Sequence, residues 1–197
     1  MIEVFNIKKG LFFGILDLAA FAREKGLNAK REIETLGKNY LMARLLDNDA
    51  AQIVYDDKGK PYLANDPGHI SLSHSHDKLV MIINEHEPTG IDIELIRNKV
   101  LRIRHKFLSP AEMDETGENV EKLLVYWAAK ETLYKIYGLK EVDFISHLFV
   151  KPFIKHNLGT IIGEINLPDF KKYFELNYQS VDDYILVYAL SEISLAE

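Results

Sequence analysis

The sequence predicts an α+β fold made of two halves that meet near Pro88 and Thr89. Apolar residues alternate at a period of two in several short runs, which is typical of strands, and recur at helical spacing in longer runs. These runs follow the order strand, helices, strands, and the same order is then repeated. A chain of 197 residues, 47% of them hydrophobic, is long enough to bury a core in each half.

The first half begins with an alternating run at residues 3–7, EVFNI, which predicts a strand. Residues 11–22 faintly resemble a signal peptide, but Asp17 interrupts their apolar run, and we expect an N-terminal helix there. A second helix is expected over residues 30–46, whose apolar residues recur at helical spacing: Ile33, Leu36, Tyr40, Leu41 and Leu45. Three further strands and one tight turn are predicted from QIVY, HISLSHS, KLVMIIN and DKGK.

The second half begins with a predicted strand at residues 90–95, GIDIEL. Residues 109–112, SPAE, form a capping-box pattern with proline at the first helical position, so a helix begins there. A longer helix is expected from about Val120 to Gly138, where the glycine serves as C-cap. An antiparallel sheet is then predicted from the runs HLFVKPF, GTIIGEINL, KYFELNYQ and DYILVYAL.

Composition argues against several classes of protein. The chain has no cysteine, which removes disulfides, thiolate zinc sites and cysteine nucleophiles. The absence of cysteine also favours a cytoplasmic location. The apolar runs of the chain stay below the roughly 18 apolar residues of a membrane span, so we expect no membrane partner. A formal net charge of −6 argues against a nucleic-acid partner. The defining residues of zincins, P-loops and hydrolase elbows are also missing.

Three carboxylates suggest a metal site. Asp92 and Glu94 lie two residues apart in a predicted strand and therefore share a face, while Glu131 falls on the apolar stripe of the longer helix. An ionised carboxylate there is costly unless it is paired or bound to a cation. Oxygen ligands suit Mg²⁺, which shares phosphate oxygens with a substrate. Alternatively, the acidic pair marks a solvated strand face, and Glu131 pairs with Lys135.

Groups able to hold phosphate occur in both halves. The candidates are two short motifs and four single residues: GKP (59–61), SHS (73–75), Lys130, Lys135, Arg31 and Arg44. Each has an ordinary alternative, since Lys60 suits a turn, and Arg31 and Arg44 suit an exposed surface. His74 and His76 offer a different alternative, a metal-binding H-x-H pair.

Taken in order, four motifs resemble those of the 4′-phosphopantetheinyl transferases, specifically the larger, surfactin-synthetase-activator type: GKP, SLSHS, GIDIE and WAAKETLYK. The resemblance covers residues 55–138. It implies a monomer of two similar α+β halves related by a pseudo-twofold, with coenzyme A between them, and we place these halves at residues 1–88 and 89–197. The shorter holo-acyl-carrier-protein synthases are instead trimers of single-half chains, and the chain length favours the larger type.

The resemblance also implies roles for individual residues. Asp92, Glu94 and Glu131 are similar to the Mg²⁺ ligands of the family. Lys135 is similar to the lysine that holds the coenzyme A pyrophosphate, with Lys130 as a companion. Lys60 and Pro61 are expected near the adenosine end of coenzyme A. Ser73 and His74 are expected to contact its phosphates. Arg31 and Arg44 lie outside the matched motifs and are further candidates for contact with coenzyme A.

The reaction implied is attack by a serine of an apo-acyl or peptidyl carrier protein on the β-phosphate of coenzyme A, which leaves 3′,5′-adenosine bisphosphate. We expect Asp92, Glu131 and Lys135 to act in catalysis. Glu131 is the candidate general base, although Lys135 or a metal-bound water could serve instead. The alternatives are a metal-dependent phosphohydrolase and a non-catalytic coenzyme A binding protein.

Residues 95–107, called here the basic segment, hold five basic residues and no acid: Arg97, Lys99, Arg102, Arg104 and Lys106. If the segment is helical, Val100, Ile103 and Phe107 face inward. Three of the basic residues then gather on the opposite face: Lys99, Arg102 and Lys106. This face is either an ordinary solvated surface or the docking surface for an acidic carrier protein.

Overall fold

The computed structural model describes residues 2–64, 66–139 and 141–195. The chain divides into two compact units, Met1–Thr89 and Gly90–Glu197. The division expected from the sequence lies one residue earlier. Each unit contains helices, a sheet and its own hydrophobic core, so the predicted α+β fold class is confirmed.

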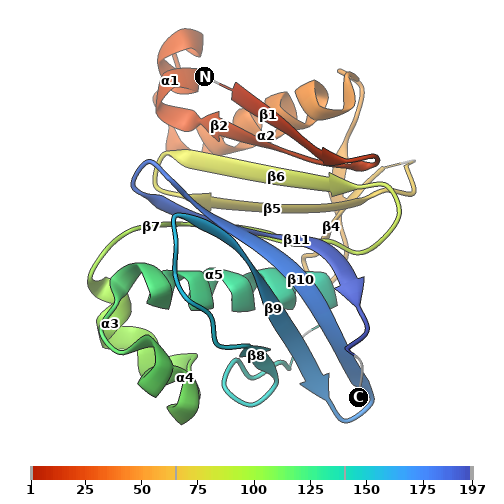
Figure 1. Ribbon diagram of the computed structural model, residues 1–197. Helices are drawn as coiled ribbons and strands as arrows, with labels where there is room; N and C mark the ends of the chain where they lie inside the picture. The colour runs from red at the N-terminus through yellow and green to blue at the C-terminus, as the bar shows by residue number, and fades with distance from the viewer. Residues whose placement is uncertain (1, 65, 140, 196–197) are drawn as a thin grey trace. The chain divides into compact units, whose positions relative to one another are not determined.

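The first unit contains a four-stranded antiparallel sheet in the order β1-β2-β6-β5 (Figure 1). Its strands are β1 (Ile2–Lys8), β2 (Leu11–Asp17), β6 (Lys78–Asn84) and β5 (His69–Ser75). After α1 (Leu18–Lys25), the longer helix α2 (Lys30–Leu46) packs on β2 and β6. A separate hairpin of β3 (Ile53–Tyr55) and β4 (Pro61–Leu63) carries the GKP motif.

The helix expected over residues 11–22 is wrong in its first part. Leu11–Asp17 forms β2, which pairs with β1 on one side and β6 on the other. A central strand buried on both faces is continuously apolar, and such a short run cannot be told from a buried helix by periodicity alone. The helix begins only at Leu18, where the side chain of Asp17 accepts a 2.7 Å hydrogen bond from Ala20 N.

The second unit contains a five-stranded antiparallel sheet in the order β7-β11-β10-β9-β8. Its strands are β7 (Ile91–Leu95), β11 (Tyr184–Ile193), β10 (Phe170–Val181), β9 (Leu158–Leu167) and β8 (Leu148–Val150). The antiparallel sheet predicted from the last four runs is confirmed. The GIDIEL strand, β7, joins it at the edge, where Asp92 lies opposite Val187 and Glu94 opposite Ile185.

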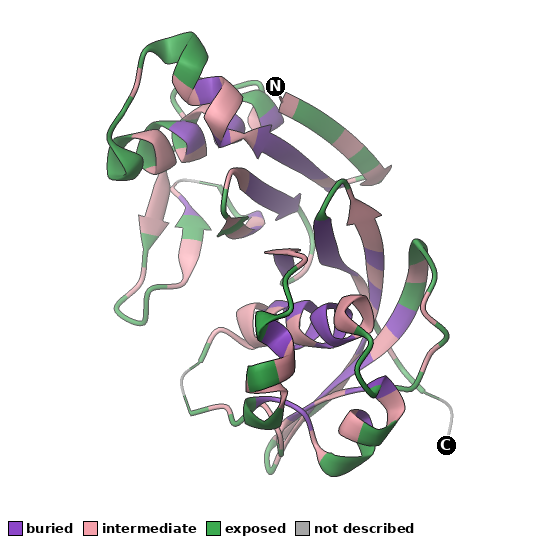
Figure 2. Ribbon diagram, turned by 90° about the vertical axis from the view of Figure 1, so that its left-hand side faces the viewer, coloured by how far each residue is buried: buried purple, intermediate pink, exposed green. Residues whose placement is uncertain are grey.

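The helices of the second unit precede most of its strands: α3 (Lys99–Ile103), the 3₁₀ turn η1 (Arg104–Lys106), α4 (Pro110–Thr116) and α5 (Val120–Tyr137). The predicted capping box is confirmed, because Ser109 and Glu112 bond each other's backbone N–H groups. α5 ends at Gly138 as predicted, with φ 68° at that residue. It packs against the sheet through β7, β8, β9 and β11, and much of its length is buried (Figure 2). None of the described helices is long and apolar enough to cross a membrane.

Candidate functional site

The three predicted metal ligands lie on two elements of the second unit that pack together. Asp92 and Glu94 are on β7, and Glu131 is on α5. Gly90, just before β7, permits this packing because a Cβ atom there would collide with the backbone oxygen of Thr132 on the helix. The glycine of the GIDIE motif therefore lets the chain that leads into the acidic strand approach the helix closely.

Asp92 is the most deeply buried of the three acids and is paired with Lys135. Asp92 is 3% exposed, and the Nζ atom of Lys135 lies 2.7 Å from the Oδ1 atom of Asp92. The same ammonium donates a 2.9 Å hydrogen bond to the backbone oxygen of Ile91. The structure thus brings Lys135, in the last turn of α5, directly beside the acidic strand.

Glu94 is held by an aromatic residue of α5. The indole N–H of Trp127 donates a 2.7 Å hydrogen bond to Glu94 Oε1. Sequence reasoning missed this contact because a tryptophan among apolar residues predicts packing. The available signal was its position four residues before Glu131, which places both side chains on one face of the helix.

Glu131 is half-buried, and its surroundings raise the pKa of its carboxyl group to about 7. Burial is the largest cause, and the negative charge of Asp92 is the next. Lys135 acts in the opposite direction, and Glu94 adds a further increase in the pKa. A carboxyl group that titrates near neutral pH is suited to accept and release a proton.

The three carboxylates fit a hard cation by their chemistry, although they do not form a ready ligand set. Among residues 2–64, 66–139 and 141–195, no three acidic or histidine side chains are placed so that they could hold a metal ion. Lys135 contacts Asp92, and Trp127 contacts Glu94. All three acids nevertheless offer oxygen ligands on adjoining elements, and a divalent cation would offset the repulsion that contributes to the raised pKa of Glu131.

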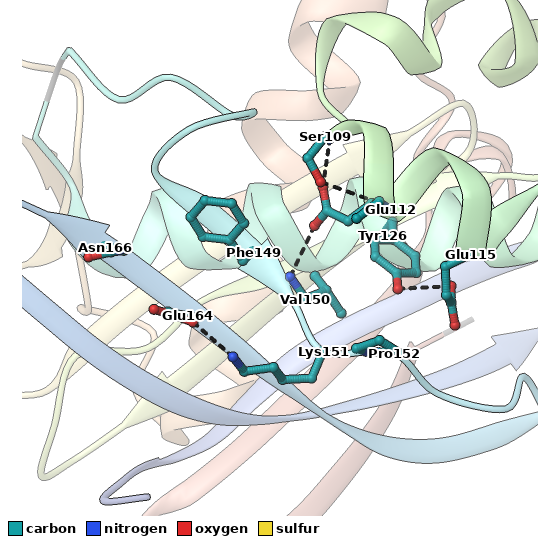
Figure 3. Close-up of a pocket in the computed structure, with 11 residues that line it drawn as sticks. Ser109, Glu112, Glu115, Tyr126, Phe149, Val150, Lys151, Pro152, Glu164 and Asn166 are labelled. Atoms are coloured by element: carbon teal, nitrogen blue, oxygen red, sulfur yellow. Dashed lines mark hydrogen bonds and ion pairs between the residues drawn. The ribbon is translucent and has the colours of Figure 1, made fainter. Parts of the chain in front are cut away.

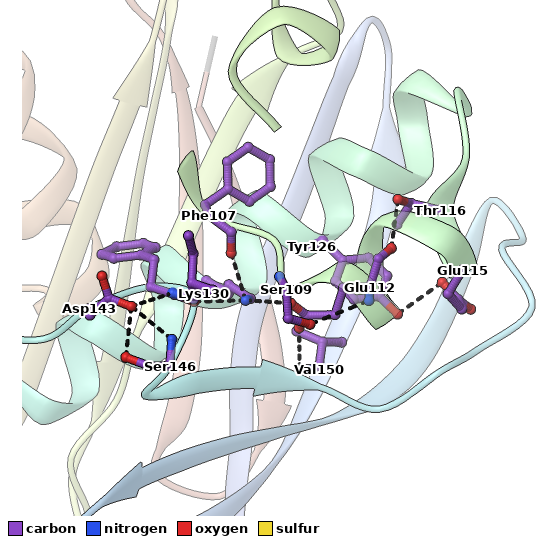
Figure 4. Close-up of polar contacts among 12 residues, drawn as sticks. Phe107, Ser109, Glu112, Glu115, Thr116, Tyr126, Lys130, Asp143, Ser146 and Val150 are labelled. Atoms are coloured by element: carbon purple, nitrogen blue, oxygen red, sulfur yellow. Dashed lines mark hydrogen bonds and ion pairs between the residues drawn. The ribbon is translucent and has the colours of Figure 1, made fainter. Parts of the chain in front are cut away.

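Lys130 does not lie with these groups, which corrects the expectation that it contacts coenzyme A. Its side chain is 0% exposed. Its ammonium donates hydrogen bonds of 2.7 Å to Phe107 O and 2.7 Å to Glu112 Oε2 (Figure 4). It donates a third, of 2.8 Å, to Phe144 O. An ammonium has three N–H donors, so these contacts use all of them and leave none for a phosphate. The sequence did not reveal this because lysine is seldom fully buried.

In the first unit, Lys60 and Pro61 line a small cavity of about 100 Å³. Burial lowers the pKa of Lys60, and burial followed by the charge of Lys60 lowers the pKa of His69 on the same cavity. Thr89 also lines it, and the buried hydroxyl of Thr89 has no hydrogen-bond partner among the described residues. The GKP motif therefore belongs to a polar cavity of this unit.

The other predicted residues of the first unit lie on β5 and α2. Ser73 is half-buried on β5, and the exposed His74 beside it lies 3.5 Å from the Glu34 carboxylate on α2. The alternative H-x-H pair gains no third metal ligand in the part of the chain that the structure describes. Arg31 and Arg44 are exposed on α2. Their positions support the ordinary alternative of surface charges.

The basic segment lies on the surface of the second unit. Lys99, Arg102 and Lys106 are exposed. Val100 and Phe107 are buried, and Ile103 is half-buried against the same core, so the predicted inward face is confirmed. The segment is only partly α-helical, because η1 follows α3. A basic face therefore begins four residues after β7, the strand that carries Asp92 and Glu94.

A larger cavity of about 330 Å³ lies beside α4 and β8 and contains none of the predicted site residues (Figure 3). Its carboxylates already have partners. Glu112 accepts from the backbone N–H of Val150, and Glu115 accepts from the hydroxyl of Tyr126. Glu164 pairs with Lys151 at 3.1 Å. These contacts support a structural role for the polar groups of this cavity.

A model of the 4′-phosphopantetheinyl transferase superfamily matches residues 88–189, just over half of the chain. The chain belongs to the 4′-phosphopantetheinyl transferase superfamily. The match includes the acids of β7 and α5 together with Lys135, and it supports phosphopantetheinyl transferase activity in general. It does not distinguish the larger type within the superfamily. No curated protein matches this superfamily member.

Proposed function

We propose that the protein transfers the 4′-phosphopantetheine arm from coenzyme A to a serine of an apo-acyl or peptidyl carrier protein, in a Mg²⁺-dependent reaction that releases 3′,5′-adenosine bisphosphate. The observation that carries the proposal is the grouping of Asp92, Glu94, Glu131 and Lys135 on two packed elements within the family match. The presence of two units, each with its own core, supports the larger, surfactin-synthetase-activator type. We further propose that the enzyme is a cytoplasmic monomer.

The proposed roles follow from charge and position. Asp92, Glu94 and Glu131 would hold Mg²⁺, which neutralises charge that develops on the phosphoryl oxygens. Lys135 contributes a second positive charge beside Asp92 and would bind the pyrophosphate. Glu131 is also the proposed acceptor of the serine proton, directly or through a water, and Lys135 is the alternative.

The remaining coenzyme A contacts are proposed from the motifs of the first unit. Lys60 and Pro61 would lie near the adenosine end, and Ser73 and His74 would meet the phosphates. The positive charge of Lys60 in a polar cavity supports its assignment to a phosphorylated ligand.

We assign carrier docking to the basic segment. Lys99, Arg102 and Lys106 expose three positive charges in a chain whose formal net charge is −6. An acidic carrier protein would be attracted to this face, and the attraction would weaken as salt screens exposed charges. The proximity of the segment to β7 would bring the serine of the carrier towards the acids.

The test is to incubate the protein with coenzyme A, Mg²⁺ and several apo-carrier proteins, and to measure the intact mass of each carrier. The proposal predicts the addition of one phosphopantetheine group to at least one carrier, and no addition when the target serine of that carrier is replaced by alanine. Cleavage of coenzyme A without modification of a carrier would favour a metal-dependent phosphohydrolase. Binding without cleavage would favour a coenzyme A binding protein.

A further inference from the structure

Two residues of α5, Trp127 and Lys130, contact the same two phenylalanines outside the helix. Lys130 Nζ donates hydrogen bonds to the backbone oxygens of Phe107 and Phe144. The rings of those two residues pack on Trp127, with Phe107 edge-on at 4.9 Å and Phe144 stacked at 5.5 Å between ring centroids. Lys130 therefore fixes the backbone of both residues whose side chains surround the indole.

The ion pair of Lys130 with Glu112 makes this arrangement rigid. Both side chains are buried, at 0% and 7% exposure. Glu112 Oε2 also accepts a 2.8 Å hydrogen bond from Ser109 N, and its Oε1 accepts a 3.2 Å bond from Val150 N (Figure 4). A buried ion pair with this many hydrogen bonds holds the attached segments in one geometry. Here it joins the start of α4 and the end of β8 to α5.

The indole extends this fixed arrangement to one of the acids. Trp127 Nε1 donates its 2.7 Å hydrogen bond to Glu94 Oε1, a charge-assisted contact. Removing a group that hydrogen-bonds to a metal ligand, and so orients it, typically weakens metal binding by about 10–100-fold. Trp127 is placed to orient Glu94 in this way.

We propose that Lys130 and Trp127 are positioning residues for Glu94. Lys130 fixes Phe107 and Phe144, their rings hold the indole of Trp127, and the indole N–H orients the Glu94 carboxylate. The significance of that orientation rests on the proposed function, in which Glu94 binds Mg²⁺. Because Phe107 ends the basic segment, the same contacts link the proposed docking surface to Glu94.

The first test removes only the indole N–H. Trp127→Phe keeps an aromatic ring between the two phenylalanines, and we expect about a tenfold higher dissociation constant for Mg²⁺ alone, measured by isothermal titration calorimetry. Tyr134→Phe is the matched control, because it removes a polar atom from another α5 ring that packs on Phe144. The control should bind Mg²⁺ as the wild type does. Equal Mg²⁺ affinity in Trp127→Phe and the wild type would overturn the role of Trp127.

The second test uses the fact that Trp127 is the only tryptophan in the chain, so that its fluorescence reports on this site alone. Lys130→Met removes the ammonium while keeping a long side chain. We expect its tryptophan emission to shift to longer wavelength and its kcat to fall about tenfold, with an unchanged KM for coenzyme A. A raised KM for coenzyme A with unchanged emission would overturn the proposal and restore Lys130 as a phosphate contact.

A further variant covers the case in which Lys130→Met does not fold, because that change leaves Glu112 buried without its cation. The double variant Lys130→Met/Glu112→Gln removes both charges and should show the same emission shift. An unchanged emission in a folded double variant would overturn the role of Lys130.

The fluorescence measurement needs neither coenzyme A nor a carrier, so it separates this proposal from the proposed function. Suppose that the wild-type protein modifies no carrier, but the tryptophan emission of the Lys130 variant is shifted relative to wild type. That result would refute the proposed function and support the contact network. Suppose instead that the wild-type enzyme modifies a carrier, but the variants have the same tryptophan emission and Mg²⁺ affinity as wild type. That result would refute the positioning role.

Discussion

The long helices of the two units differ in how far they are enclosed. In the first unit, α2 packs on its sheet through buried residues such as Leu41 and Met42, and its other face is exposed to solvent, including Arg31 and Arg44. In the second unit, α5 is largely buried (Figure 2). Lys130, the residue before Glu131, is 0% exposed. A charge on an exposed helix face is solvated, whereas a charge on an enclosed helix must be paired or must shift its pKa.

Besides the sheet, other elements of the second unit pack on α5. The short helix α3 packs on it, and Phe107 and Phe144 cover its aromatic face. The charges of α5 consequently have defined partners, such as Lys130 with Glu112 and Lys135 with Asp92. The comparison teaches that the chemically informative charges belong to the enclosed helix and to the strand beside it.

The largest effect is expected from neutralising the acids of the second unit. Asp92→Asn and Glu131→Gln each remove a charge with little change in volume, and each should lower kcat/KM for transfer more than tenfold while the fold is retained. The control Arg44→Gln on α2 should stay near wild-type activity. If either acid variant keeps more than about a tenth of the wild-type kcat/KM, its activation free energy has risen by less than roughly 1.4 kcal/mol, and that acid is not a metal ligand.

The basic segment should give the next largest effect. Reversing Lys99, Arg102 and Lys106 to Glu should raise the KM for an acidic carrier about tenfold at low salt, because attraction becomes repulsion. The KM for coenzyme A should not change, and the difference from wild type should diminish as salt is added. Unchanged carrier kinetics at low salt would contradict the docking assignment.

A pH-dependent stability difference would sharpen the comparison of the helices. The pKa of Glu131 is raised to about 7, so the folded state favours the protonated carboxyl group. The contribution of this preference to the free energy of unfolding is lost as pH rises through 7. Without divalent cations, Glu131→Gln should therefore have a higher free energy of unfolding than wild type at pH 8, by about 1–2 kcal/mol after allowance for partial exposure. The difference should disappear below about pH 4.5, where the carboxyl is protonated in both states.

Urea denaturation at pH 4, 6 and 8 would measure this difference. Glu32→Gln, on the exposed face of α2, is the control and should change the free energy of unfolding little at any of these pH values. A wild-type protein as stable as Glu131→Gln at pH 8 would contradict the electrostatic account of this site.

The smallest effect is expected in the first unit. His74→Ala should weaken coenzyme A binding about threefold to tenfold, the loss of one exposed hydrogen bond to a phosphate. An equal loss for dephospho-coenzyme A would place His74 at the pyrophosphate or adenosine, and a loss for coenzyme A alone would place it at the 3′-phosphate. Unchanged affinity for both ligands would remove His74 from the site.

Local patterns in the sequence were sufficient for much of the second unit. Alternation in GIDIE places Asp92 and Glu94 on one face, and the SPAE capping box together with Gly138 defines helix ends. Periodicity places Trp127 on the helix face of Glu131, but it could not reveal the burial of Lys130 or the hydrogen bond from Trp127 to Glu94, because these depend on residues from other parts of the chain. The β2 strand was mistaken for a helix because its burial on both faces removes the alternation that identifies strands.

The central claim is that the enclosed acids of the second unit serve transfer to a carrier protein. It is tested most directly by measuring the release of 3′,5′-adenosine bisphosphate and the intact mass of the carrier in the same reaction. The account predicts one bisphosphate for each phosphopantetheine group added, with both products absent when EDTA is present or when Glu131 is replaced by Gln. Release of a coenzyme A fragment without a change in carrier mass, or undiminished transfer by Glu131→Gln, would contradict it.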